Sequence, residues 1–171
     1  MNKIYILVAL LMLSTLIIGC DSVDSWKNTI PGVVSVGTTG AITLETRYTS
    51  EPMSQEIAVV KGGLEDINTT IRFSVEKAML DSMNHIDGTT YELLPESCYL
   101  FTQNTVSLNV GVRSGKAVFQ YDPAKIEALC GYNTIIYVLP LVAQSEGLPL
   151  NKERRIVLYK FKILQPDIRT N

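Results

Sequence analysis

The chain has 171 residues, with 15 basic and 17 acidic side chains and a formal net charge of −2. This balance argues against nucleic-acid binding, which needs a basic patch or stripe. The length suits a single domain with a sizeable core. We therefore expect one compact domain and no nucleic-acid partner.

Residues 1–19 have the features of a lipoprotein signal peptide. Lys3 precedes an uncharged, mostly apolar run over residues 4–18, which is shorter than the roughly 20 residues of a membrane-spanning helix. Gly19 followed by Cys20 resembles the recognition box of signal peptidase II, which cleaves in front of a cysteine that carries diacylglycerol. We expect Cys20 to be lipidated and to become the mature N-terminus. An ordinary secretory signal with an incidental cysteine is the alternative.

Residues 20–31, which are polar and irregular, are predicted to form the acylated cysteine and a flexible tether. Asp21 and Asp24 follow Cys20 closely, and this resembles the export signals of lipoproteins that reach the outer face of the outer membrane in Bacteroidetes-type bacteria. The resemblance implies an outer-membrane, lipid-anchored protein at the cell surface. The membrane, reached through the lipid, is thus an expected partner.

Residues 32–164 are predicted to form an all-β domain. In residues 67–76, apolar and threonine side chains alternate with polar ones, with the period of two that a half-buried strand requires. Further strands are expected over residues 42–48, 55–61, 106–112, 117–121, 134–142 and 155–163. Residues 113–116 are predicted to be a hairpin turn, and Pro140 to lie at a bulge or strand end because it cannot donate a ladder hydrogen bond. About seven strands favour an antiparallel β-sandwich.

Two short helices are expected to cross between strands. Residues 76–84 contain helix formers and end before the turn signal Asp87-Gly88. Asp122 is suited to cap a second helix whose first position would be Pro123. Residues 165–171 are predicted to be a short tail.

Several segments together resemble a known family. Tyr91-Glu92-Leu93-Leu94-Pro95-Glu96-Ser97-Cys98-Tyr99 and Tyr137-Val138-Leu139-Pro140-Leu141, with the strand over residues 106–112, resemble the Bacteroidetes lipoprotein domain of unknown function 1735. The resemblance covers residues 33–163 and implies an immunoglobulin-like sandwich. Such domains lie between a lipid anchor and a C-terminal module, such as a family 18 glycoside hydrolase or a lectin-like domain, in glycan-utilisation systems. The sequence ends eight residues after Ile163, so we expect that module to be missing.

The sequence offers little catalytic or metal-binding chemistry. His85 is the only histidine, so a zinc site or a Ser-His-Asp triad is poorly supplied. Glu92 and Glu96 flank Pro95 and could act as the two carboxylates of a glycosidase, but solvated loop charges explain them better. We predict no cofactor and no catalytic residue.

Cys98 and Cys130 could form a disulfide in an oxidising envelope, although two isolated cysteines favour free thiols. Sugar binding would need exposed aromatic rings, for which Tyr91, Tyr99 and Tyr132 are the candidates. Three hypotheses remain open. We favour a noncatalytic surface lipoprotein that serves as accessory or scaffold in glycan capture, with a polysaccharide or an outer-membrane glycan-uptake complex as partner. The alternatives are direct carbohydrate binding and, least favoured, glycoside hydrolysis.

Overall fold

The computed structural model describes residues 30–166. Contacts within the chain divide it into two units, residues 1–31 with 63–65 and residues 32–62 with 66–171. In the described part of the first unit, the Leu64 N–H donates to the Ile30 carbonyl at 3.1 Å. The predicted signal peptide, Cys20 and most of the tether lie outside the described residues.

The second unit contains two β-sheets. The first, which we call sheet A, has the strand order β1-β3-β8-β6 and is antiparallel throughout. Its strands are β1 (Val33–Val36), β3 (Met53–Gly62), β8 (Ser114–Tyr121) and β6 (Tyr99–Gln103). The ten residues of β3 pair with β8 along most of their length and with β1 only at the Gly62 end.

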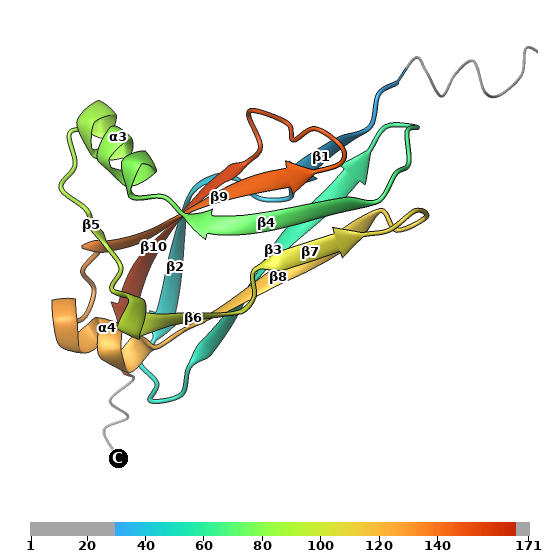
Figure 1. Ribbon diagram of the computed structural model, residues 1–171. Helices are drawn as coiled ribbons and strands as arrows, with labels where there is room; N and C mark the ends of the chain where they lie inside the picture. Colours follow the sequence, from blue (N-terminus) through green and yellow to red (C-terminus); the bar gives the residue numbers. More distant parts are fainter. Residues whose placement is uncertain (1–29, 167–171) are drawn as a thin grey trace, which may run out of the picture. The chain divides into compact units, whose positions relative to one another are not determined.

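Sheet B has the order β2-β10-β9-β4-β7, and β5 adds to β9 beyond the end of β4. Its strands are β2 (Gly40–Arg47), β10 (Ile156–Leu164), β9 (Tyr137–Glu146), β4 (Thr69–Val75), β7 (Thr105–Leu108) and β5 (Glu92–Leu93). Two of its pairs are parallel, β2 with β10 and β5 with β9, while the others are antiparallel. Figure 1 shows the chain passing from β1 in sheet A to β2 in sheet B.

The expected all-β sandwich of immunoglobulin type is confirmed, because two sheets of largely antiparallel strands enclose one core. The strands number ten in the described chain rather than about seven. The unexpected ones, β1, β5 and β6, are short, and short strands give too few alternating positions for the period of two to stand out.

The core fills the space between the sheets with aromatic and aliphatic side chains. Phe119 of sheet A lies 5.2 Å from the ring of Tyr159 in sheet B, and Tyr121 lies 5.1 Å from Phe161. The Tyr121 hydroxyl and the Thr46 hydroxyl are 2.5 Å apart, so the buried polar end of this tyrosine has a partner across the sheets. These ring pairs join the two sheets through alternate residues of β8 and β10.

Short helices complete the fold. Helix α3 (Lys77–Asp87) follows β4, buries Leu80 and Met83, and ends at Gly88, whose φ of 63° lies in the left-handed region that glycine adopts readily. A 3₁₀ turn, η1 (Glu96–Cys98), precedes β6, and α4 (Pro123–Cys130) follows β8. The two predicted helices are thus confirmed. None of the helices in residues 30–166 has the length and apolar character to cross a membrane.

Two sequence predictions need correction at the β7–β8 connection. The strand predicted over residues 106–112 ends at Leu108, and the turn lies at residues 109–113 instead of 113–116. Val110 and Val112, expected to face the core, are exposed. Alternating valines predicted a longer strand, but β4 has no residue left to pair beyond Thr69 and Leu108.

Pro140 lies within β9 rather than at the end of that strand. Its carbonyl accepts from the Glu76 N–H, directly after the last residue of β4, Val75, which pairs with Leu141. On this side β9 changes its neighbour from β4 to β5. In a strand, the N–H and the C=O of one residue point to the same side. The side on which Pro140 lacks an N–H is therefore the side where the pairing with β4 has ended and the pairing with β5 has not begun, so no ladder hydrogen bond is lost.

Candidate functional site

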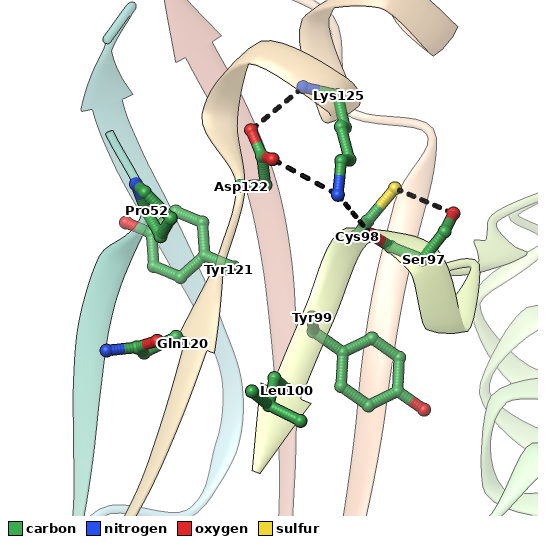
Figure 2. Close-up of a pocket in the computed structure, with 9 residues that line it drawn as sticks. All are labelled: Pro52, Ser97, Cys98, Tyr99, Leu100, Gln120, Tyr121, Asp122 and Lys125. Atoms are coloured by element: carbon green, nitrogen blue, oxygen red, sulfur yellow. Dashed lines mark hydrogen bonds and ion pairs between the residues drawn. The ribbon is translucent and has the colours of Figure 1, made fainter. Parts of the chain in front are cut away.

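A pocket with a volume of about 150 Å³ opens where β6, β8 and α4 meet at one end of sheet A (Figure 2). It brings together one carboxylate, one ammonium group, hydroxyl groups, an amide and a thiol. The lining residues are Pro52, Ser97, Cys98, Tyr99, Leu100, Gln120, Tyr121, Asp122 and Lys125. This pocket is the candidate functional site because it contains two of the residues singled out in the sequence, Cys98 and Tyr99.

The charged groups of the pocket come from the start of α4. Asp122 precedes Pro123, and its Oδ1 accepts the backbone N–H groups of Ala124 and Lys125, both at 3.1 Å. Lys125 Nζ lies 3.4 Å from Asp122 Oδ2 and donates to the Ser97 carbonyl at 3.0 Å, so its side chain bridges α4 and η1 (Figure 2). Asp122 therefore caps a helix and pairs with a lysine, two structural tasks.

The floor of the pocket is held by backbone hydrogen bonds around Cys98. The Cys98 N–H donates to the Pro95 carbonyl and the Cys98 carbonyl accepts from the Asp122 N–H, both at 2.9 Å. Its Sγ is buried and lies 3.9 Å from the Ser97 hydroxyl. These bonds tie η1 to the β8–α4 junction and fix the position of Tyr99.

Tyr99 is half-buried and packs edge-on against Phe101, with 6.1 Å between ring centroids. Burial raises the pKa of its phenol, and the nearby Glu96 carboxylate raises it further. The phenol therefore stays protonated at neutral pH and can act as a hydrogen-bond donor.

The other two tyrosines lie elsewhere. Tyr91 precedes β5 beside sheet B, and Lys160 Nζ is 4.6 Å above its ring and 3.4 Å from its hydroxyl. Tyr132 follows α4 and meets Tyr48 edge-on at 5.9 Å. Within residues 30–166 no ring contact joins any two of the three predicted tyrosines, and each has a different partner. The structure does not assemble them into one stacking platform.

Cys98 and Cys130 are both free thiols in the structure. Cys130 ends α4, and its Sγ donates to the Ile126 carbonyl one helical turn earlier at 3.2 Å. Partial burial raises the pKa of the Cys130 thiol, with smaller contributions from Glu127 and Cys98. A raised pKa lowers the thiolate fraction and so the nucleophilicity of this cysteine.

The remaining acids and the single histidine are dispersed. Glu92 is exposed on β5 opposite Tyr137, Glu96 is exposed at the start of η1, and His85 is exposed in the last turn of α3. Between residues 30 and 166, no three His, Cys, Asp or Glu side chains lie close enough to hold a metal ion. The arrangement can offer hydrogen bonds and a small apolar surface to a ligand.

Sequence reasoning did not find the pocket itself. It singled out Cys98 and Tyr99, and it predicted the cap at Asp122, but it gave no role to Lys125 or Leu100. Leu100 lies in β6, and Lys125 reaches the pocket by its hydrogen bond to η1. The sequences of β6 and η1 show no alternating pattern, so the Asp122-Pro123 helix start was the signal for this region.

Comparison with known proteins places the chain among N-terminal domains. A family model that describes an N-terminal domain matches residues 27–148. No curated protein matches the chain in sequence. The solved structures described next are 20% identical to it or less, so the property that they share with it is the fold.

Three of the similar structures, all from Bacteroides, show the extent of the likeness. A candidate carbohydrate-binding protein from Bacteroides ovatus ATCC 8483 is 20% identical with a TM-score of 0.63, and the match covers 76% of this chain and 36% of that one. EndoBT-3987 from Bacteroides thetaiotamicron, solved with a Man5GlcNAc product, is 13% identical with a TM-score of 0.59, covering 76% and 30%. A multidomain protein from Bacteroides ovatus that includes domain of unknown function 1735 is 16% identical with a TM-score of 0.54, covering 81% and 46%. The chain thus spans between about a third and a half of these proteins.

Proposed function

This chain belongs to the family of N-terminal domains whose model spans its residues 27–148, and we propose that it is a noncatalytic surface lipoprotein domain that serves glycan capture. In this proposal a lipid on Cys20 holds the sandwich at the outer membrane. The sandwich acts as accessory or scaffold for a polysaccharide or an outer-membrane glycan-uptake complex, in the manner of domain of unknown function 1735.

The observation that carries the proposal is the shared sandwich. The same fold accounts for about a third of a candidate carbohydrate-binding protein and of EndoBT-3987. In each of these proteins most of the chain lies outside the matched part, so the chemistry of the whole protein need not lie in the sandwich. A supporting role for this domain is the simplest function compatible with that division.

A noncatalytic role also agrees with the pocket. Glycoside hydrolysis needs two opposed carboxyl groups on either side of the scissile bond. The pocket lining contains one carboxylate, Asp122, and that group already caps α4 and pairs with Lys125. Glu92 and Glu96 are exposed outside the lining.

Direct sugar binding is the second candidate, and the pocket gives it a specific place. Gln120 contributes an amide and Lys125 an ammonium group, while Leu100 adds exposed apolar surface. The ring of Tyr99 points away from these groups and packs against the core (Figure 2). Polar groups that surround a small apolar surface suit a single sugar ring. Because the rings of Tyr91, Tyr99 and Tyr132 all lie away from this surface, such binding would lack a stacking ring and would be weak.

Two measurements test the proposal. In cells fed labelled palmitate, the label should enter the wild-type protein and not the Cys20→Ala variant. In the same cells, retention of a fluorescent polysaccharide should fall in Cys20→Ala and stay unchanged in Leu100→Ala, which removes the exposed apolar surface of the pocket. An unlabelled wild-type protein would overturn the lipid anchor.

The same assays separate the alternatives. A loss of retention in Leu100→Ala equal to that in Cys20→Ala would replace the scaffold role by direct binding. Polysaccharide hydrolysis by the purified protein that disappears in Glu92→Gln would replace it by catalysis.

A further inference from the structure

Four exposed aliphatic side chains gather near one end of the sandwich. They are Val110, with 64% of its surface exposed, and Val60, Val112 and Ile67, each with more than 40%. Val110 and Val112 belong to the β7–β8 turn, Ile67 lies just before β4, and Val60 pairs with Ser114 directly after the turn. We call these four residues the apolar tip. Apolar side chains that stay exposed at one end of a domain offer a contact for a partner or a membrane.

The backbone of the β7–β8 turn is satisfied by the protein itself. Asn68 Oδ1 accepts the Val110 N–H at 3.0 Å, and Asp66 Oδ2 accepts the Gly111 N–H at 2.9 Å. The Val112 N–H donates to the Asn109 carbonyl at 3.0 Å. Exposed turns commonly leave such groups to water. Here the N–H groups of three successive residues have protein partners, so these three groups can enter an apolar medium without losing hydrogen bonds.

The charges beneath the turn are also compensated. Lys61, whose side chain is fully buried, donates to the carbonyls of Leu108 and Asn109 and forms an ion pair of 2.6 Å with Asp66. Arg113 lies 3.7 Å from the same carboxylate, and 45% of its side chain is exposed. A half-exposed guanidinium at the base of an apolar turn suits a phosphate-rich surface, because arginine binds phosphate oxygens well and extends towards polar headgroups.

The chain enters the sandwich beside the apolar tip. Val33, the first residue of β1, pairs with Gly62, and the preceding Lys61 donates its backbone N–H to the Arg113 carbonyl at 2.8 Å. Figure 1 shows the start of β1 (blue) and the β7–β8 turn (yellow) at the same end of the sandwich. The twelve residues between Cys20 and Val33 span at most about 40 Å when fully extended, so a lipid on Cys20 keeps this end within that distance of the bilayer.

We propose that the apolar tip inserts into the interface of the membrane that holds the lipid on Cys20, with Arg113 at the level of the headgroup phosphates. This inference rests on the lipid anchor of the proposed function. The pocket lies at the Met53 end of β3 and the apolar tip at its Gly62 end, which a ten-residue strand places about 30 Å apart. Insertion therefore directs the pocket away from the membrane.

Tryptophan quenching tests the proposal on the full chain. Trp26, the only tryptophan, is replaced by phenylalanine so that one added tryptophan is the sole reporter. Val110→Trp places it on the apolar tip, and Ile86→Trp places the matched control on α3, where Ile86 is 80% exposed. Each acylated product is reconstituted in phosphatidylcholine–phosphatidylglycerol vesicles with or without brominated acyl chains. Mass spectrometry reports the lipid on Cys20, and circular dichroism the fold.

In the expected result, Val110→Trp emits at shorter wavelength in vesicles and brominated lipid quenches it, while Ile86→Trp changes in neither respect. Equal behaviour of the two reporters on a lipidated protein would overturn the inference and leave the anchor intact. A wavelength shift without quenching would assign the apolar tip to a protein contact, such as a second copy, and would also overturn it. A product without lipid would overturn the anchor and this inference together.

Discussion

Replacing Lys61 by methionine tests how firmly the β7–β8 turn is held, because methionine has similar length without the charge. The Lys61 ammonium donates to the carbonyls of Ile67 at 3.1 Å, Leu108 at 3.3 Å and Asn109 at 3.0 Å. The bond to Leu108 is fully buried, and the other two are partly buried. Methionine would remove all three bonds and the ion pair with Asp66, and keep the volume.

The expected loss of stability depends on which of the three carbonyls keep another hydrogen-bond donor. The Ile67 carbonyl also accepts from the Thr69 hydroxyl at 3.1 Å, and the Asn109 carbonyl from the Val112 N–H at 3.0 Å. A buried polar group left unpaired costs about 1–3 kcal/mol, and the two carbonyls with second donors should cost less. We expect Lys61→Met to lower the free energy of unfolding by about 3 kcal/mol.

Urea unfolding followed by circular dichroism at pH 7 measures this loss. Lys116→Met is the matched control, because Lys116 forms an ion pair with Glu56 in which both side chains are more than half exposed. Such pairs contribute less than about 1 kcal/mol. If Lys61→Met destabilises the protein no more than Lys116→Met does, the buried bonds of Lys61 do not hold the turn.

Acid adds a second readout of the same site. The hydrogen bond from Lys61, followed by that from the Gly111 N–H, holds the pKa of Asp66 below its ordinary value. A carboxyl group with a lowered folded-state pKa stabilises the fold above its unfolded pKa of about 3.9, and this contribution is lost as pH falls through the folded value. Lys61→Met raises the folded pKa of Asp66, so the stability difference from wild type should narrow below pH 4.

Three further predictions concern other parts of the sandwich. Gly147→Ala should lower the free energy of unfolding by at least about 2 kcal/mol in urea, because Gly147 has a φ of 109° and a Cβ there would lie 2.6 Å from the Asn68 carbonyl oxygen. Gly40→Ala is the control and should cost clearly less, because Gly40 has a φ of 83° but no atom within 4 Å of the added Cβ. Equal losses in the two variants would contradict the close contact at Gly147. Asp122→Ala should cost about 1 kcal/mol by removing the cap of α4, with Asp122→Asn close to wild type in thermal unfolding; an unchanged melting temperature in Asp122→Ala would show that the cap is dispensable. Burial raises the pKa of Tyr159 to about 12, so the stabilisation from its neutral phenol is complete below pH 10 and is lost as pH rises through 12. Tyr159→Phe should therefore reduce unfolding at alkaline pH, and ultraviolet titration of this variant should lose one late-ionising phenol. An unchanged titration curve would contradict the burial of this phenol.

Periodicity predicted the long strands well. Residues 42–48 and 155–163 alternate because one face of β2 and β10 meets the core, and the structure places both strands within two residues of the expected bounds. The Asp122-Pro123 helix start was also confirmed, since its signal is local. Parallel pairing of β2 with β10 could not be predicted, because alternation is the same for either direction of the neighbour.

The prediction for residues 106–112 was wrong in an informative way. The valines at 110 and 112 continue the alternation of β7, but the chain turns after Leu108 and leaves them exposed. Binary patterning reports where apolar residues alternate and assumes that their common face meets the core. At the apolar tip, the common face of these apolar residues meets solvent instead. A local conflict between sequence pattern and structure is expected at binding sites. The candidate pocket was harder to predict, because its residues come from three stretches that are far apart in the sequence, at residue 52, residues 97–100 and residues 120–125.

The parallel pairing of β2 with β10 determines how the fold responds to tension. Eight residue pairs, from Gly40 with Val157 to Arg47 with Leu164, join the first strand of sheet B to the last strand of the domain. A pull on the two chain ends draws these strands past each other lengthwise, so their hydrogen bonds must break together rather than one after another. Force spectroscopy that pulls on the two chain ends should therefore record one high rupture peak instead of gradual extension.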